Sequence, residues 1–302
     1  MIFRTDLAQE AAEKIRDAGL KEESFTVNGL HGERVTITSD SAAEAAGKKK
    51  GTYITLETEA VRNRATDRFR AVSEAAAKVI RDLLKEIPAQ APVLVAGLGN
   101  AKMTPDAIGP ETAERVFVTS HILKYLPEAA DRRLRPVCAM APGVLGVTGI
   151  ESADVISAVC RKEKIAALIV VDALAARRSE RMFSTIQLTD AGIEPGAGVG
   201  NRRGGLNRET LGIPVLALGM PTVVYASSLT YEAVLRLLTA RGADEEEAER
   251  EAEKLRLFAD DLVVTPKEID VLARDAAGIL ADALNLALHD HVSLEEIRAC
   301  MR

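Results

Sequence analysis

Two aspartates stand at matching places in the sequence. Asp106 follows the apolar run 93–97 and a turn, and Asp172 directly follows the apolar run 167–171. Short apolar runs bounded by turn residues are typical of buried parallel strands. Ligands of open α/β sheets bind at the carboxyl ends of such strands. If the two strands are neighbours, we expect both carboxyl groups at one edge of the sheet.

A close pair of carboxyl groups can carry out acid–base chemistry. Like charge and partial burial raise the pKa of one group and leave that of the other low. One group can then activate a water while the other protonates a leaving group. The alternative is that Asp172 is a helix N-cap and that Asp106 stabilises the first turn of a helix. Each aspartate taken singly favours capping, whereas the pair favours catalysis.

Other chemistries are less well supported by the motifs. The Gly-Leu-Gly-Asn sequence at 97–100 is too short for a dinucleotide fingerprint, and residues 196–201 lack the Lys-Ser/Thr of a phosphate loop. No GxSxG nucleophile elbow is present. The histidines, none of them beside an expected strand end, are His31, His121, His289 and His291. We therefore expect neither a metal nor a cofactor.

The cysteines also lack a metal-ligand spacing. They are Cys138, Cys160 and Cys300, an odd number at wide intervals. We expect reduced thiols in a cytoplasmic protein.

The elements that must position the aspartates form an α/β pattern. Apolar runs at 93–97, 137–141, 167–171 and 215–219 alternate with helical periodicity. This predicts one three-layer α/β domain over residues 1–302, with a mostly parallel twisted sheet flanked by helices. An N-terminal β-hairpin is expected within residues 24–37, around Asn28-Gly29.

Further elements follow from local signals. Helices are expected over residues 8–18, 62–87, 229–258 with a break near Gly242, and 265–288, with capping boxes at Thr265 and Ser293. The Lys48–Lys50 run is interpreted as a solvated turn. The Gly-rich segment 187–212 is interpreted as a loop over one rim of the sheet.

Composition restricts the partners. Lys plus Arg is 39 and Asp plus Glu is 45, a net charge of −6, and aromatic residues make up 3% with no Trp. Neither a basic face nor a stacking platform for nucleic acid is indicated. The N-terminus lacks the apolar stretch of a signal peptide, and the run 165–171 is far shorter than the ~20 residues of a membrane span. We expect a soluble protein without direct contact to nucleic acid or membrane.

The longer motifs resemble those of the germination protease family of spore-forming bacteria. They are GLGNAKMTPDAIGP (97–110), APGVLGVTGIESADVI (141–156), IVVDALAAR (169–177), STIQLTDAGIEPGAGVGNRR (184–203), ETLGIPVLALGMPTVV (209–224), RTDLA (4–8), GKKKGTYITLE (47–57) and LVVTPKEID (262–270). They occur in order over nearly the whole chain. The resemblance implies an endopeptidase of the spore core that degrades small acid-soluble spore proteins early in germination.

The resemblance also implies site residues and an assembly. The catalytic carboxylates of the family match Asp106 and Asp172. Its zymogen processing motif matches Asp6 before Leu7, so residues 1–6 would be a propeptide removed by self-cleavage, and the family is homotetrameric. Residues in the same motifs that we expect to bind or support are Asn100, Thr104, Arg177, Asp190 and Asn201.

Three departures and two alternatives accompany this resemblance. The extension before Arg4 is very short, Tyr225 replaces the Asp that usually follows Pro-Thr-Val-Val, and the region 229–262 is shorter than in many relatives. One alternative is a metal-dependent protease of the hydrogenase-maturation type, which holds its metal with two carboxylates and a histidine. The other is a non-catalytic protein that binds a phosphate or peptide group through residues 196–201.

Overall fold

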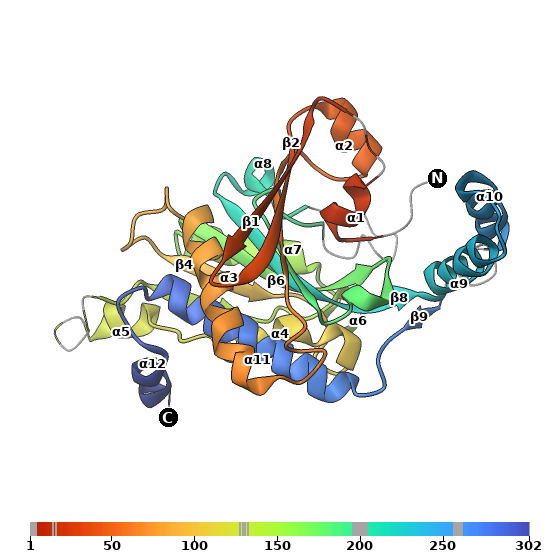
Figure 1. Ribbon diagram of the computed structural model, residues 1–302. Coiled ribbons are helices and arrows are strands. Elements are labelled where there is room, and N and C mark those ends of the chain that lie inside the picture. The colour runs from red at the N-terminus through yellow and green to blue at the C-terminus, as the bar shows by residue number, and fades with distance from the viewer. Residues whose placement is uncertain are drawn as a thin grey trace.

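A nine-stranded sheet with helices on both faces forms the body of the protein (Figure 1). This computed structural model describes residues 5–13, 15, 17–126, 128, 131, 133–194, 205–255 and 262–301. The strands are β1 (Leu20–Val27), β2 (Leu30–Ile37), β3 (Gly51–Glu57), β4 (Val93–Gly97), β5 (Val137–Met140), β6 (Ala167–Ala176), β7 (Thr185–Thr189), β8 (Val215–Tyr225) and β9 (Val263–Val264).

The helices connect and cover these strands. They are α1 (Ala8–Ala12), α2 (Asp40–Ala46), α3 (Phe69–Leu83), α4 (Ile108–Ala113), α5 (Ser120–Tyr125), α6 (Leu145–Thr148), α7 (Ser152–Lys162), α8 (Arg208–Leu211), α9 (Ala226–Ala240), α10 (Glu245–Leu255), α11 (Ile269–Leu288) and α12 (Leu294–Cys300). Three short 3-10 helices are η1 (Thr66–Arg68), η2 (Thr104–Asp106) and η3 (Ser179–Arg181).

The sheet has a parallel half and an antiparallel half. Its order is β1-β2-β3-β7-β8-β6-β4-β5, and β9 pairs with β8. Strands β8, β6, β4 and β5, the four expected from sequence, are parallel to one another. The hairpin β1–β2 turns at Asn28-Gly29 as predicted, and β3 and β7 join it to β8 by antiparallel pairing. The predicted α/β class is confirmed, and β4 and β6 are neighbours.

Alternate residues of each strand face opposite sides of the sheet. On one side, Val95, Ile169 and Leu218 join the largest apolar cluster, which includes residues of α3, α4 and α11. On the other side, Val170 and Ala217 pack with residues of α7. Figure 1 shows α3 and α11 lying together across the sheet. The two layers of helices account for the predicted three-layer architecture.

Glycines allow α4 to lie directly on the ends of β4 and β6. A Cβ on Gly97 would lie 2.0 Å from the carbonyl oxygen of Gly109. A Cβ on Gly109 would lie 2.1 Å from the carbonyl oxygen of Leu98 and 2.5 Å from that of Val171. Gly97 therefore permits close packing of a helix, whereas a role in turning the chain belongs to Gly99, which has φ 110°.

Several predicted boundaries need correction. Helix α1 ends at Ala12, and α3 begins at Phe69 after η1. The predicted loop 187–212 starts later than 187, because β7 extends to Thr189. The Thr265 capping box is wrong: α11 begins at Ile269, and the Thr265 hydroxyl donates to the carbonyl oxygen of Thr222 at 3.1 Å. The Ser293 capping box is confirmed at α12.

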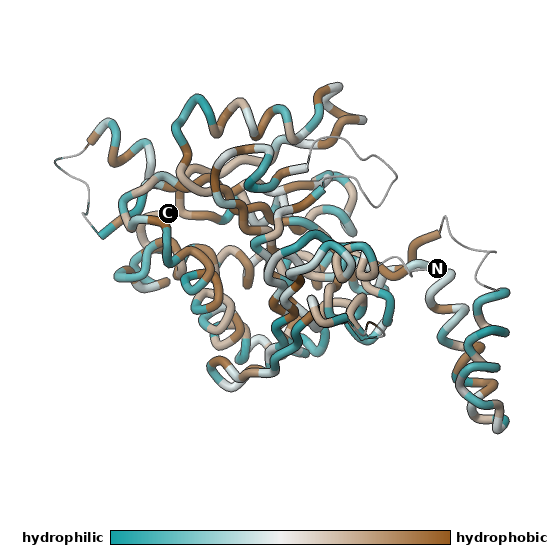
Figure 2. Tube along the Cα trace, turned by 90° about the horizontal axis from the view of Figure 1, so that it is seen from above, coloured by the Kyte–Doolittle hydropathy of each residue, from teal (hydrophilic) through white to brown (hydrophobic). Residues whose placement is uncertain are grey.

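Helices α9 and α10 form an antiparallel pair that extends beyond the sheet (Figures 1 and 2). The chain breaks between them at Gly242, which has φ 87°, as predicted. The residues of α9 that are buried, Ser227 and Ser228, lie at its start, while Leu237 is 50% exposed. Within the described residues, no helix combines the length and apolar character needed to cross a membrane.

Candidate active site

Asp106 is the last residue of η2, which follows the carboxyl end of β4. Its Oδ2 accepts a hydrogen bond from the backbone N–H of Asn100 at 2.7 Å. A Cβ on Gly99 would lie 2.1 Å from the carbonyl oxygen of Asp106, so glycine is needed there. The Thr222 hydroxyl donates to the carbonyl oxygen of Pro105 at 2.7 Å and ties η2 to β8. The N-cap residue of α4 is Ala107 and has no side-chain cap, while Asp106 lies in the first turn of η2.

Asp172 lies within β6 rather than at the start of a helix, so the N-cap alternative is wrong. Its Oδ1 accepts from the backbone N–H of Ala173 at 2.9 Å. Burial raises the pKa of Asp172 well above its usual value, and the negative charges of Asp106 and Asp6 raise it further. Burial also raises the pKa of Asp106, while the hydrogen bond from Asn100 opposes that shift. The negative charge of Asp106 thus acts on the carboxyl group of Asp172.

Asp6 and Leu7 lie along β6, on the side of the sheet that carries Asp172. The N–H of Asp6 donates to the carbonyl oxygen of Ala175 at 2.9 Å, and the N–H of Ala175 donates to Asp6 Oδ2 at 2.7 Å. Leu7 is fully buried against Leu174, Ala176 and Val224. Because residues 172, 174 and 176 share one face of β6, Leu7 lies on the face that carries Asp172.

Gln187 on β7 holds the same segment from the other side. Its Nε2 donates to the carbonyl oxygen of Asp6 at 2.7 Å, and its Oε1 accepts from the N–H of Ala8 at 2.6 Å. In the sheet register, Gln187 pairs with Gly219 and Gly219 pairs with Asp172. With strands roughly 5 Å apart, the backbones of Gln187 and Asp172 lie about 10 Å apart across Gly219.

Gln187 was missed as a site residue because it was assigned to a loop. The alternation of apolar and polar residues in Thr185-Ile-Gln-Leu-Thr189 is the strand signal that could have placed it. Ile186 and Leu188 join the large apolar cluster on one face, so Gln187 must point to the other.

Glu10 of α1 anchors the N-terminal segment. It is 2% exposed and accepts from the backbone N–H groups of Arg177 and Arg178, at 2.7 and 3.0 Å. The Thr5 hydroxyl donates to Glu10 Oε2 at 2.5 Å. Arg177, a predicted site residue, also pairs with Glu13. Arg177 therefore fixes α1 to the end of β6.

The Lys48–Lys50 run is only partly a solvated turn. Lys49 and Lys50 are exposed, but Lys48 is half-buried and its Nζ donates to the carbonyl oxygen of Thr5 at 2.8 Å. Burial lowers the pKa of Lys48, and the negative charges of Asp6 and Glu10 oppose that shift. The interpretation of Lys48 as a solvent-facing residue was wrong, since it holds the N-terminal segment.

The remaining predicted residues divide between the site and other places. Asn100 contacts Asp106 through its backbone N–H, and Thr104 begins η2. Asp190 lies at the end of the β3–β7 pair, where its Oδ1 accepts from the N–H of Thr52 at 2.7 Å. It supports the sheet rather than the acid pair. Asn201 lies outside the described residues.

Potential metal ligands gather elsewhere. Across the part of the chain that the structure describes, the group of three that comes within ligand distance is His31, Glu33 and Glu57, on β2 and β3. His289 is fully buried, with Nε2 3.3 Å from the carbonyl oxygen of Phe117. Cys138, Cys160 and Cys300 are free thiols.

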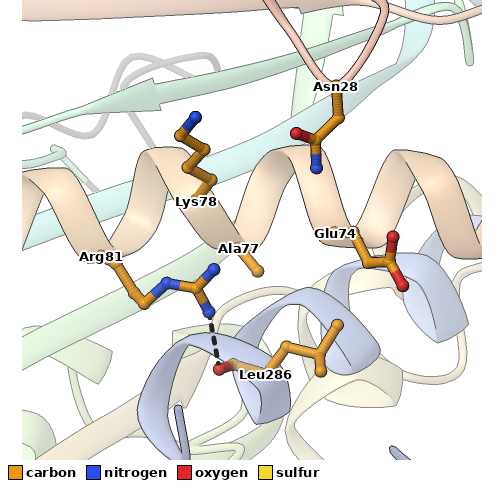
Figure 3. A pocket seen from close by; sticks show the side chains of 6 residues that line it. All are labelled: Asn28, Glu74, Ala77, Lys78, Arg81 and Leu286. Carbon is orange, nitrogen blue, oxygen red and sulfur yellow. Dashed lines mark hydrogen bonds between the residues drawn. The ribbon is translucent and has the colours of Figure 1, made fainter.

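A pocket of about 300 Å³ lies on the opposite side of the sheet from Asp172. Figure 3 shows it between the β1–β2 turn, α3 and α11, lined by Asn28, Glu74, Ala77, Lys78, Arg81 and Leu286. Arg81 Nη1 donates to the carbonyl oxygen of Leu286 at 3.0 Å on its wall. Since α3 and α11 cover the face that lacks Asp172, this pocket is separate from the acid site.

Fold and site together define an α/β protein with two carboxyl groups at the carboxyl end of its parallel strands. Residues 6–8 of its own chain lie on the face of the sheet that carries Asp172. The germination protease family model matches residues 2–259 and 244–300. The chain therefore belongs to the germination protease family, a family of endopeptidases, and the resemblance seen in the sequence is confirmed.

Curated relatives agree over nearly the full length. The chain is 38% identical to the germination protease of Bacillus cytotoxicus, covering 98% of this chain and 96% of that protein. It is 38% identical to the germination protease of Clostridium tetani, covering 99% of each. Among solved structures, a NiFe hydrogenase maturation protease, HycI from Thermococcus kodakarensis, aligns with TM-score 0.36 and 16% identity over 68% of this chain and 98% of that chain.

Proposed function

We propose that this protein is an endopeptidase that initiates degradation of small acid-soluble spore proteins during germination, with Asp106 and Asp172 as its acid–base pair and water as nucleophile. The observation that carries the proposal is the position of the Asp6–Leu7 peptide bond. Leu7 packs on Leu174 and Ala176, on the face of β6 that bears Asp172. A segment of peptide chain is thus bound on the face of β6 that carries Asp172, which supports the proposal.

The surroundings of the two aspartates suggest their roles. Asp172 is surrounded by negative charge and by protein, which favours its protonated form and the role of general acid. Burial raises the pKa of Asp106 too, but the N–H of Asn100 opposes that shift and no charge among the described residues adds to it, so Asp106 is the better candidate for the ionised general base. Asp106 would take a proton from the attacking water, and Asp172 would give its proton to the leaving nitrogen as the C–N bond breaks.

Self-processing is part of the same proposal. Cleavage at Asp6–Leu7 would remove residues 1–6 and leave Leu7 as the new N-terminus. The backbone N–H of Ala175 donates a hydrogen bond to the Asp6 carboxylate. Leu7 packs in the apolar cluster with Leu174 and Ala176. This arrangement favours substrates with an acidic residue before the cut and an apolar residue after it.

The setting of the enzyme extends the proposal. We assign it to the cytoplasm of the spore core, as a homotetramer that contacts neither membrane nor nucleic acid directly. The α9–α10 pair, with Leu237 half exposed, offers apolar surface for contacts between subunits.

Replacement of either aspartate tests the acid–base pair. Asp106→Asn and Asp172→Asn should each slow loss of residues 1–6 and cleavage of a small acid-soluble spore protein by about 10²–10⁴-fold, the usual contribution of a general acid or base. Intact mass follows the N-terminus, gel electrophoresis follows the substrate, and circular dichroism checks the fold. Asp190→Asn is the matched control, because that carboxylate bonds only to strand backbone in the structure described.

Full activity in either dyad variant would rule out the acid–base pair. The same assay with a chelator tests the metal-dependent alternative, and we expect no loss of activity. Loss restored by nickel or zinc would favour a metalloprotease. Absence of any cleavage together with tight peptide binding in calorimetry would favour a non-catalytic binding protein.

A further inference from the structure

The side-chain amide of Gln187 spans the peptide bond that we propose is cut. Its Nε2 lies 2.7 Å from the carbonyl oxygen of Asp6, and its Oε1 lies 2.6 Å from the backbone nitrogen of Ala8. The carbonyl must face a donor and the backbone N–H must face an acceptor, so these two partners fix the orientation of the amide. The one residue between them is Leu7, whose nitrogen would become the leaving group.

We propose that Gln187 is a catalytic residue, whose Nε2–H stabilises the negative charge that develops on the scissile carbonyl oxygen. Its Oε1 at the same time fixes the register of the bound chain. This inference rests on the proposed function, since it requires that Asp6–Leu7 is the bond that is cut.

In the proposed reaction, negative charge develops on the Asp6 carbonyl oxygen, which lies 2.7 Å from Gln187 Nε2. When the water oxygen bonds to the carbonyl carbon of Asp6, the electron pair of the C=O double bond moves to the oxygen, and Asp106 takes the proton of the water. The Nε2–H already points at that oxygen. When the tetrahedral intermediate collapses, the pair returns to the carbonyl, the C–N bond breaks, and the nitrogen of Leu7 leaves with a proton from Asp172.

The sheet supplies the preorganisation that such a donor needs. Gln187 is 6% exposed and lies in the middle of β7, paired with Thr55 of β3 and Gly219 of β8. A donor fixed on a central strand does not need to reorganise as charge develops. Gly219 has no side chain between Gln187 and Asp172, and a Cβ there would lie 2.1 Å from the carbonyl oxygen of Asp172. The bare strand leaves room for the peptide between the donor and the acid.

Gln187 also differs from its neighbours on the same face of β7. The hydroxyl of Thr185 donates to the carbonyl oxygen of Arg181, and that of Thr189 accepts from the N–H of Ala191, so both serve the local backbone. In Gln187, by contrast, both side-chain polar atoms form hydrogen bonds with the N-terminal segment, Nε2 with Asp6 and Oε1 with Ala8. A substrate protein bound in place of residues 5–8 would meet the same donor and acceptor.

The test compares three variants of the full chain by the first-order rate of loss of residues 1–6, followed by intact mass. Gln187→Glu keeps an acceptor for Ala8 but replaces the donor with an oxygen, so the rate should fall about 10²–10³-fold, as for other oxyanion donors. Gln187→Met removes both contacts at similar size and should be at least as slow. Thr189→Val, on the same strand and face, should process like the unsubstituted chain.

Hydrogen exchange separates a catalytic role from a structural one. In the uncleaved Asp172→Asn background, residues 5–12 should be as protected with Gln187→Glu as without it, because the Ala8 contact is kept. With Gln187→Met the Ala8 amide should exchange faster. Slow processing with the segment still protected is the expected result for Gln187→Glu.

Three results would overturn the inference, and they differ in what else they affect. If the unsubstituted chain never loses residues 1–6, self-processing fails and the role of Gln187 fails with it. If the unsubstituted chain is processed and Gln187→Glu is equally fast, only the role of Gln187 fails. If Gln187→Glu is slow and residues 5–12 have lost protection, Gln187 merely holds the segment in place.

Discussion

The two faces of the sheet use the same strands for different purposes. On one face, Val95, Ile169 and Leu218 are covered along their length by residues of α3, α4 and α11. On the other, α7 covers Val170 and its neighbours, but residues 6–8 lie on the side of the row formed by Asp172, Gly219 and Gln187. The pleat therefore separates the core that stabilises the fold from the groups that we propose act on a peptide. Substitutions on the two faces should separate in the same way.

The largest effect on stability is expected on the covered face. Leu280 of α11 is fully buried in the large cluster. Leu280→Ala should lower the free energy of unfolding by about 2–5 kcal/mol, through lost burial and the cavity that remains. Urea unfolding measures this, and Leu126→Ala, whose side chain is 60% exposed after the end of α5, is the control. A folded Leu280→Ala protein that processes as slowly as the dyad variants would contradict the separation of the two faces.

An intermediate effect is expected from the anchor of the N-terminal segment. Glu10→Gln removes the charge that receives the N–H groups of Arg177 and Arg178. Opening of residues 5–12 should become easier by about 1–3 kcal/mol, as for other buried hydrogen-bonded groups. Hydrogen exchange measures the opening, and intact mass should show slower processing. Glu44 is an exposed acid on α2, so Glu44→Gln should change neither the opening nor the processing. If Glu10→Gln lowered global stability as much as Leu280→Ala, the N-terminal segment would belong to the core.

The smallest effect is expected for the stability of Asp172→Asn, and it is a gain rather than a loss. Because the native pKa of Asp172 is raised, ionised Asp172 is unfavourable in the folded protein at neutral pH. Acidification through that pKa lets the native state bind a proton before the unfolded state does, so stability rises as pH falls. Asp172→Asn should therefore have a higher Tm than the unsubstituted chain at pH 7. The advantage should shrink on acidification, and a lower Tm of the variant at pH 7 would contradict the raised pKa.

The parallel half of the fold could be predicted because its signals are local. Short apolar strands that alternate with helices are compatible with only a few sheet topologies. In these topologies the carboxyl ends of neighbouring parallel strands lie together, which brings Asp106 and Asp172 to one edge of the sheet. Asn28-Gly29 likewise specified its hairpin through the turn it favours. The placement of the two aspartates at one edge of the sheet could thus be predicted from the sequence alone.

The contacts around the pair were not predictable, because they join segments far apart in sequence. Nothing near Gln187 indicates that β7 pairs with β8 and faces residues 6–8. The Thr265 motif has the residues of a capping box, yet its hydroxyl bonds to Thr222 on β8 instead. Lys48 lies in a sequence typical of a solvated turn, and only the position of Thr5 gives it a partner. In each case a tertiary contact outweighs the local preference.

The row of Gln187, Gly219 and Asp172 also has a consequence for how accurately this chain must fold. The three residues meet only because β7, β8 and β6 pair in one register. A slip of one residue between β7 and β8 would turn Gln187 into the apolar core and bring Ile186 or Leu188 to the peptide. Such a molecule would keep most hydrogen bonds of the sheet but would lose the contacts of Gln187 with Asp6 and Ala8. Ile186 and Leu188 disfavour this slip, because their burial in the apolar core would be lost. Their apolar side chains therefore fix the register that positions Gln187.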